Sequence, residues 1–267
     1  MKRKIRLYEY DPEINRTFIP SSGYLENTVA NGLEAKEYRV RTNSSGFILP
    51  FGLESNETKG SSIILGDSIA ECIFLDEEYR IESILQNRNK DNLYLNHGYS
   101  GATTLDILNI IINKIVPLEP KKIFLMSGIV DGNISMKGFY HQDDETSTIV
   151  ESPKSVNSIN NFLQHREILL NTVFDIVKKF EIEIIIGTIG HRHNPSDPNG
   201  KFLCLPIENN IYHKINKQTL RIAMDRSIKF IDFEGLMYDH FDLHYDSYHL
   251  NKKGANLVAN ELLNIGF

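Results

Sequence analysis

The sequence predicts an α/β protein built on a parallel sheet with helices on both faces. From Ser61 onward, short apolar segments of strand length alternate with segments of helical periodicity. The strand candidates are apolar throughout rather than at every second residue, which is typical of parallel strands buried on both faces. The five predicted strands cover residues 63–65, 93–95, 122–126, 183–187 and 228–231.

Helices connect these strands, and two long polar segments interrupt the alternation. A helical region follows the first strand to about Arg88, and amphipathic helices are predicted near residues 169–180, 210–226 and 255–262. One more helix ends at Pro117, and its apolar face is formed by Leu105, Leu108, Ile112 and Ile115. The polar segments, residues 132–160 and 190–206, carry no period, and loops of this length are often lids or binding loops.

Residues 1–60 differ from the rest of the chain. They lack helical periodicity and are interrupted by glycine and proline at short intervals. We therefore predict an N-terminal extension, residues 1–60, packed on a main domain of residues 61–267. Within the extension, residues 38–41 are the best strand candidate by alternation.

Composition narrows the class of protein. Of 267 residues, 41% are hydrophobic, and 35 acidic residues exceed 29 basic ones, which argues against binding nucleic acid through phosphate neutralisation. Cys72 and Cys204 lack the spacing of a zinc site or a disulfide framework and indicate a reducing compartment. Neither a signal peptide nor an apolar run of membrane-spanning length is found, so a soluble, cytoplasmic protein is predicted.

The first segment that indicates chemistry is Gly66-Asp67-Ser68, where an apolar run stops abruptly. A strand that ends in glycine, followed by two residues able to cap a helix, predicts a strand-to-helix turn. Such a turn places Ser68 at the carboxyl edge of the sheet, where open α/β sheets bind their ligands. The Ser68 hydroxyl is therefore a candidate nucleophile, and capping of the next helix is the alternative role.

A candidate general base lies near the C-terminus, where Asp246 precedes His249 by three residues. At this spacing the carboxylate can lie beside the imidazole and fix its tautomer, while the other ring nitrogen takes a serine proton. A surface ion pair or a helix cap explains the same spacing. Asp242, flanked by His240 and His244, offers a rival pair.

The loop after the second strand carries two glycines. Because glycine lets backbone N–H groups approach a ligand closely, Gly101 is a candidate donor to an oxyanion. A turn in which Thr103 or Thr104 caps the next helix is the alternative.

Histidines elsewhere raise the question of a metal. His191, His193 and His213 lie in or near the second polar segment. Histidine is the commonest metal ligand, but a polar surface loop explains the spacing as well. We predict neither a metal nor a cofactor.

In their order and spacing, these segments resemble the SGNH hydrolases, the GDSL-type esterases and lipases. The resemblance covers about residues 60–265 and implies a three-layer α/β/α sandwich with a flavodoxin-like parallel five-stranded sheet. The first block matches Gly66-Asp67-Ser68, the second resembles Asn96 with Ser100-Gly101-Ala102-Thr103, and the last resembles Asp246, His249, Leu250 and Gly254.

The resemblance also implies roles for these residues. Ser68 would be the nucleophile, His249 the base and Asp246 the residue that orients it. The oxyanion donors would be the backbone N–H groups of Ser68 and Gly101. We group Asp67 with these oxyanion and substrate-binding residues.

The third block departs from the family pattern. Its Gly-x-Asn-Asp aligns with Gly128-Ile129-Val130-Asp131, so a valine stands where an asparagine donates to the oxyanion. Loss of one such donor has cost about 2.7–4 kcal/mol in a protease. Three outcomes are compatible with this valine. Another side chain replaces the missing donor, or the enzyme is slow or takes an unusual substrate, or the site binds its ligand without turnover. We favour replacement by Asn133, for which a turn is the alternative role.

The expected function is a serine esterase that hydrolyses a short acyl ester through an acyl-enzyme. An O-acetylated carbohydrate is a candidate substrate by analogy with the family. An acyltransferase that uses the same site, and a non-catalytic protein that binds a carbohydrate or acyl group, are the alternatives.

Overall fold

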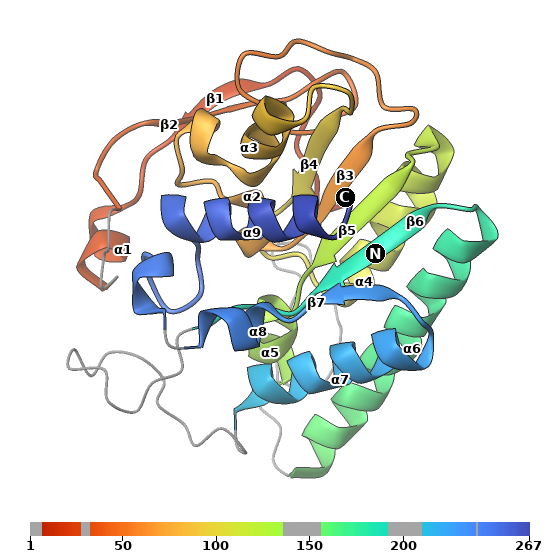
Figure 1. Cartoon of the computed structure of the whole chain (residues 1–267). Coiled ribbons are helices and arrows are strands. Elements are labelled where there is room, and N and C mark those ends of the chain that lie inside the picture. The colour runs from red at the N-terminus through yellow and green to blue at the C-terminus, as the bar shows by residue number, and fades with distance from the viewer. Residues whose placement is uncertain (1–6, 28–32, 136–155, 192–209, 239) are drawn as a thin grey trace, which may run out of the picture.

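The computed structural model describes residues 7–27, 33–135, 156–191, 210–238 and 240–267 (Figure 1). Within them, five parallel strands form the main sheet in the order β4-β3-β5-β6-β7. The predicted α/β/α fold class and all five predicted strands are confirmed. The strands are β3 (Ser62–Gly66), β4 (Tyr94–Gly98), β5 (Lys122–Met126), β6 (Glu183–Gly187) and β7 (Lys229–Ile231).

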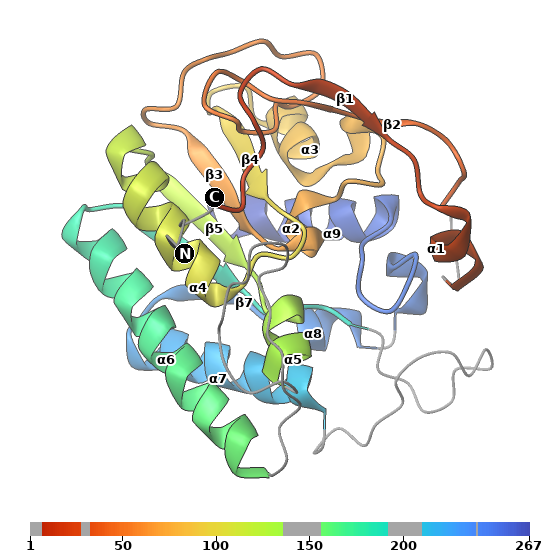
Figure 2. The same ribbon diagram turned by 180° about the vertical axis from the view of Figure 1, so that it is seen from behind.

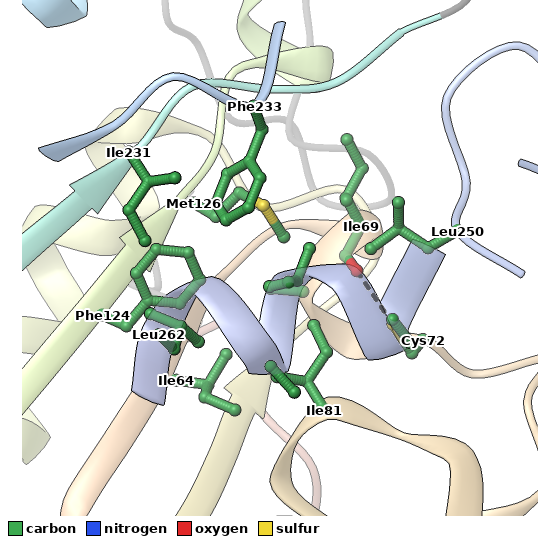
Figure 3. Close-up of a cluster of buried hydrophobic side chains, with 14 of the residues drawn as sticks. Ile64, Ile69, Cys72, Ile81, Phe124, Met126, Ile231, Phe233, Leu250 and Leu262 are labelled. Atoms are coloured by element: carbon green, nitrogen blue, oxygen red, sulfur yellow. Dashed lines mark hydrogen bonds between the residues drawn. The ribbon is translucent and has the colours of Figure 1, made fainter. Parts of the chain in front are cut away.

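Each face of the sheet is covered by helices over its own apolar core. On one face, Ile64 and Phe124 pack with Leu262 and other residues of α9 (Figure 3). On the other, Ile63 and Leu125 pack with residues of the helices seen in front in Figure 2. The first face carries α2 (Ser68–Glu71), α3 (Ile81–Arg88), α8 (Phe233–Met237) and α9 (Lys252–Asn264), and the second carries α4 (Thr104–Ile110), α6 (Val156–Lys179) and α7 (Ile211–Asp225).

The helical region predicted as far as Arg88 is divided in two. Helix α2 ends at Glu71, and the residue that follows it, Cys72, has a left-handed backbone conformation with φ of 52°. A short 3-10 turn (Glu77–Tyr79) follows before α3 begins. The Cys72 thiol is buried and donates to the Ile69 carbonyl over 3.1 Å, and burial raises its pKa (Figure 3). Cys204 lies outside the described residues.

The predicted apolar face of the α4 segment is wrong in part. Ile107, Ile110, Ile111 and Ile115 are buried, whereas Ile112 is 47% exposed. Apolar residues occur on nearly every side of this segment, and a π-helical turn (Ile111–Ile115) changes the angular spacing after α4. The sequence was therefore compatible with several faces. A 3-10 turn (Val116–Leu118), which contains Pro117, ends the segment.

The two polar segments fall mainly outside the described residues. Helices α5 (Ile129–Ser135) and α6 extend into the two ends of the first segment, so residues 132–135 and 156–160 are helical and not part of a loop. Of the second segment, only residues 190–191 are described. Among the helices in the described parts of the chain, none combines the length and the apolar character that a membrane crossing needs.

The N-terminal segment packs along the edge of the main sheet. Strand β1 (Asn15–Phe18) pairs antiparallel with β2 (Tyr38–Arg41), as predicted for 38–41, and α1 (Ser22–Asn27) lies between them in sequence. Ile48 exchanges two backbone hydrogen bonds with Asn96, of 2.8 and 3.1 Å, and so covers the edge strand β4. The division into an extension and a main domain stays a prediction.

Candidate active site

Ser68 lies at the carboxyl end of the central strand β3. Gly66 closes this strand, and a Cβ at Gly66 would lie 2.0 Å from the carbonyl oxygen of Met126 on the neighbouring strand β5, so the close approach of the two strands requires glycine. Asp67 caps α2 by accepting the Ile69 N–H over 3.1 Å. Asp67 therefore supplies the predicted cap, and Ser68 is the first residue of the helix.

The Asp67 carboxylate also joins this turn to α5. Its second oxygen accepts the N–H groups of Gly128 and Ile129 over 2.9 and 3.1 Å. The side chain is fully buried, and burial raises its pKa while the backbone hydrogen bonds act in the opposite direction. Asp67 thus holds the start of α5 beside the Ser68 turn.

Asp246 and His249 are held in a tight loop before α9. Tyr245 N–H donates to the His249 carbonyl over 3.0 Å and closes the loop. Inside it, Asp246 Oδ1 accepts the N–H groups of Tyr248 and His249 over 2.9 and 2.7 Å. The backbone therefore fixes the orientation of the Asp246 carboxylate.

The structure brings Ser68, His249 and Asp246 into one hydrogen-bonded chain. His249 Nε2 lies 2.8 Å from Ser68 Oγ, and His249 Nδ1 lies 2.6 Å from Asp246 Oδ2. Burial raises the pKa of Asp246, but the His249 side chain and the backbone N–H groups outweigh it and hold this pKa well below its usual range. Because the carboxylate can only accept, it assigns the proton to Nδ1 and leaves Nε2 as the acceptor for the Ser68 hydroxyl.

The rival pair has a different role. Asp242 contacts Lys253, with Nζ 2.9 Å from Oδ2, on the exposed side of the same loop. His244 is buried, and His240 is exposed. The surface ion pair that was one alternative for Asp246 is thus found at Asp242.

Aromatic rings surround the His249 imidazole. Tyr245 stacks on it at 5.5 Å between ring centroids with planes 11° apart, and Tyr248 lies at 4.8 Å. Tyr212 of α7 lies 6.4 Å from Tyr248. It also packs on α5, where a Cβ at Gly132 would approach its ring to 2.2 Å.

The loop after β4 runs beside α2. A Cβ at Gly98 would lie 2.2 Å from the Glu71 backbone nitrogen, so the glycine permits the strand end to touch α2. Gly101 follows with φ of 90°. The Asn96 side chain of β4 is buried and donates to the Ala70 carbonyl of α2 over 2.8 Å. As one alternative expected, Thr103 caps α4.

A buried glutamate ties this loop to α2. Glu71 accepts both the N–H, over 3.0 Å, and the hydroxyl of Ser100, the residue before Gly101. It also accepts the hydroxyl of Tyr10 from the N-terminal segment. Burial raises the pKa of Glu71, while the bonds from Ser100 and Tyr10 lower it. Glu71 thus ties the loop that carries Gly101 to α2, and the N-terminal segment bonds the same carboxylate.

The third block forms the start of α5. Val130 is half-buried, and Asn133 lies in the same helix, with its side chain outside the described part of the structure. Asp131 is buried and accepts Arg166 Nε over 2.8 Å and the Thr104 N–H over 3.0 Å. This buried ion pair connects α5 to α6 and to the start of α4.

Two of the three histidines considered as metal ligands contact a glutamate, Glu234. His213 Nδ1 is 3.0 Å from Glu234 Oε1, and His191 Nε2 is 3.7 Å from the same oxygen. His193 lies outside the described residues. In the parts of the chain that are described, no cluster of three or more metal-ligating side chains is found.

Three contacts at the site were missed by sequence reasoning. Tyr24 and Tyr10 reach the site from a segment that carried no motif, and Glu71, three residues after Ser68, was given no role. The Tyr24 hydroxyl donates to Asp246 Oδ2 over 2.8 Å across a separation of 222 residues. Nothing local in residues 1–60 could have indicated these contacts.

A hydrogen-bonded chain of Ser, His and Asp occurs in serine hydrolases on several unrelated folds. No protein-family model and no curated relative matches this chain. Solved structures do share its fold. An acetyl xylan esterase, AlAXEase, matches at 17% identity with a TM-score of 0.58, over 78% of this chain and 100% of the other.

Two further structures match as well. A member of the lipolytic G-D-S-L family from Veillonella parvula is 19% identical over 77% of this chain and 97% of its own, with a TM-score of 0.54. The acetylxylan esterase Axe2 from Geobacillus stearothermophilus is 17% identical over 79% of this chain and 96% of its own, also with a TM-score of 0.54. At such identities the likeness establishes the fold that this chain shares with GDSL-type esterases.

Proposed function

We propose that this protein is a serine esterase of the SGNH type. The observation that carries the proposal is the chain of contacts from Ser68 Oγ to His249 Nε2 and from His249 Nδ1 to Asp246 Oδ2. It lies at the carboxyl end of the central strand, at the edge where open α/β sheets bind ligands. A serine-to-alanine variant of Axe2, which shares the fold, is described as a catalytic mutant.

In this mechanism Ser68 Oγ attacks the ester carbonyl carbon while His249 Nε2 takes its proton. Asp246 stabilises the imidazolium that forms. Collapse of the tetrahedral intermediate breaks the bond to the alcohol, which leaves with the proton from Nε2. Water, deprotonated by His249, then attacks the acyl carbon, and as the bond to Ser68 Oγ breaks His249 returns the proton to that oxygen, which releases the acid and restores the free enzyme.

The oxyanion would accept the backbone N–H groups of Ser68 and Gly101, with Asn133 as the third donor in place of Val130. Glu71 and Asp67 support this assignment because each holds one side of the site. Glu71 fixes Ser100 beside Gly101, and Asp67 anchors the start of α5. Asp67 is fully buried and enters this proposal as a positioning residue rather than a group that touches substrate.

The substrate class we propose is a short acyl ester of a carbohydrate. Two of the enzymes that share the fold are acetylxylan esterases by name. In this chain, the half-buried ring of Tyr248 lies beside His249, and the half-buried ring of Tyr212 lies beside Tyr248. Rings with an apolar face and a polar hydroxyl suit a ligand with both kinds of surface. The finer substrate and a cytoplasmic location remain predictions.

The test is labelling with a fluorophosphonate probe together with hydrolysis of p-nitrophenyl acetate. Wild type should react with both, and Ser68→Ala with neither. Ser44→Ala, at an exposed serine in a turn, is the matched control and should behave as wild type. A wild-type protein inert to both reagents would overturn the esterase proposal.

Val130 favours one alternative, a protein that binds a carbohydrate or acyl group without turnover, because valine cannot donate to an oxyanion. Asn133→Ala addresses this point. If Asn133 is the third donor, its loss should lower kcat about 10²- to 10³-fold. An unchanged kcat would place the donor elsewhere. Acyl transfer on the same site would appear as an ester product when a sugar acceptor is added.

A further inference from the structure

The N-terminal segment contributes a side chain to the Asp246 carboxylate. The Tyr24 hydroxyl of α1 donates to Asp246 Oδ2 over 2.8 Å. The same oxygen lies 2.6 Å from His249 Nδ1, and the Tyr24 oxygen is itself 3.4 Å from that nitrogen. Two donors therefore share one carboxylate oxygen, and one of them comes from outside the segments that carry the family motifs.

Tyr24 is held in place by its own apolar cluster. Its ring lies 5.7 Å from that of Phe74, which in turn lies 5.7 Å from that of Tyr38. Leu33 and Tyr245 are buried in the same cluster. Because Tyr245 also stacks on His249, the cluster contacts the flat face of the imidazole, whereas Ser68 lies at the Nε2 atom on its edge.

We propose that Tyr24 is a positioning residue that tunes the Asp246–His249 pair, an inference that rests on the proposed function. Asp246 Oδ1 is already fixed by two backbone N–H groups, so the carboxylate cannot turn away when Tyr24 is changed. The hydroxyl therefore acts mainly through charge. It draws part of the carboxylate's negative charge onto its own hydrogen bond and leaves less for the imidazolium.

Several groups face His249 in the described structure. Asp246 is the one whose charge lies directly against the imidazole. Asp67 interacts electrostatically with Tyr248, and Cys72 with Tyr245. The groups at His249 are Asp246, Tyr245 and Tyr248 on its own loop, Tyr24 on α1 and Ser68 on α2, with Asp67 and Cys72 beside the two tyrosines of the loop.

The sign of the effect follows from this arrangement. In Tyr24→Phe the full carboxylate charge faces the imidazole, so the protonated form of His249 becomes more stable and the base is lost at a higher pH. The acidic midpoint of the kcat/KM profile should rise by about 0.5–1 pH unit. At pH values well below that midpoint, where kcat/KM falls tenfold per pH unit, the variant should be about three- to tenfold slower than wild type.

The experiment measures p-nitrophenyl acetate hydrolysis by Tyr24→Phe between pH 5 and 9. Tyr38→Phe is the matched control, because it removes a hydroxyl from the same cluster that bonds Glu34 instead of Asp246. A purely structural role would lower stability in both variants and leave both midpoints at the wild-type value. That result would overturn the proposal, since water would then replace the Tyr24 hydroxyl without consequence.

A second measurement separates this inference from the proposed function. The His249 imidazole is titrated by NMR in wild type, Tyr24→Phe and Tyr38→Phe, with no substrate present. A midpoint that rises only in Tyr24→Phe supports the role of Tyr24 even if wild type hydrolyses no ester, in which case the esterase proposal alone fails. A midpoint that stays constant in all three proteins refutes the role of Tyr24 whatever the activity.

Discussion

Replacement of Asp246 by asparagine tests the site sharply, because the structure dictates which way the new amide must face. Oδ1 accepts two backbone N–H groups, those of Tyr248 at 2.9 Å and His249 at 2.7 Å. An NH₂ group there would oppose two donors. The amide oxygen must therefore keep the Oδ1 place, and the NH₂ group takes the place of Oδ2, 2.6 Å from His249 Nδ1.

The consequence for His249 is a change of tautomer. The new NH₂ group can only donate to Nδ1, so the ring proton moves to Nε2, which then faces Ser68 Oγ. A protonated Nε2 cannot take the serine proton. The equivalent change in a chymotrypsin-type protease lowered kcat about 10⁴-fold. We expect a similar loss, about 5.4 kcal/mol of transition-state stabilisation at 1.36 kcal/mol per tenfold change.

The assay is kcat for p-nitrophenyl acetate at pH 7.5, with Asp242→Asn as the control. Asp242 is a carboxylate of the same chain region that pairs with Lys253 at the surface, so its loss should change kcat less than twofold. Asp246→Asn should unfold close to the wild-type temperature, because both backbone hydrogen bonds persist. A folded Asp246→Asn protein with kcat within tenfold of wild type would refute the reasoning.

Three other contacts in the fold give further expected outcomes. Arg166→Met leaves the Asp131 carboxylate buried without its cation and should lower the free energy of unfolding, measured in urea titrations, by about 3–5 kcal/mol. Adding Asp131→Leu should restore most of that free energy. A double variant as unstable as the single one would contradict this expectation. His97 and Lys114 hold the pKa of Glu9 at about 2, below the 4.5 of an unperturbed glutamate. The ionised Glu9 side chain therefore stabilises the folded protein above pH 4.5, and this contribution is lost as pH falls toward 2. Glu9→Gln should therefore cost about 1–2 kcal/mol at pH 7, after allowance for solvent screening, and progressively less in titrations below pH 4.5; a cost independent of pH would count against the ion pair. Gly98→Ala should force β4 away from α2, which lowers the unfolding temperature and the rate of Ser68 labelling together, whereas a normal labelling rate would show that α2 tolerates the shift.

The sheet could be predicted because its strands are buried on both faces. Residues 122–126 and 183–187 are apolar enough, and short enough, that the observed strands begin and end at the predicted residues. Ser68, Asp246 and His249 could be proposed because each lies beside a local signal, a strand end or a helix start. Parallel strands then bring these ends to one edge of the sheet.

What could not be predicted depends on packing between distant segments. Tyr24 meets Asp246 across 222 residues, and Tyr10 meets Glu71 across 61. Both tyrosines lie in a segment without periodicity, where no rule of spacing relates a residue to its partner. The prediction of which residues of the α4 segment are buried was wrong in part for a different reason. The segment has apolar residues on nearly every side, so only its neighbours in the fold select which of them are covered.

Val130 lies directly after two residues whose backbone N–H groups bond the Asp67 carboxylate. The carboxylate takes up the N–H groups of Gly128 and Ile129, so these two donors of the α5 start serve the turn and not a ligand. Helix α5 begins beside the turn that carries Ser68, and position 133 lies about 4.5 Å further along the helix axis than position 130. A donor at Asn133 therefore suits an oxyanion displaced toward α5, or one reached through a water molecule. If Asn133→Ala leaves kcat unchanged in an active enzyme, the oxyanion must be held by the backbone of the Ser68 turn and the Gly101 loop, which Glu71 and Asp67 fix in place.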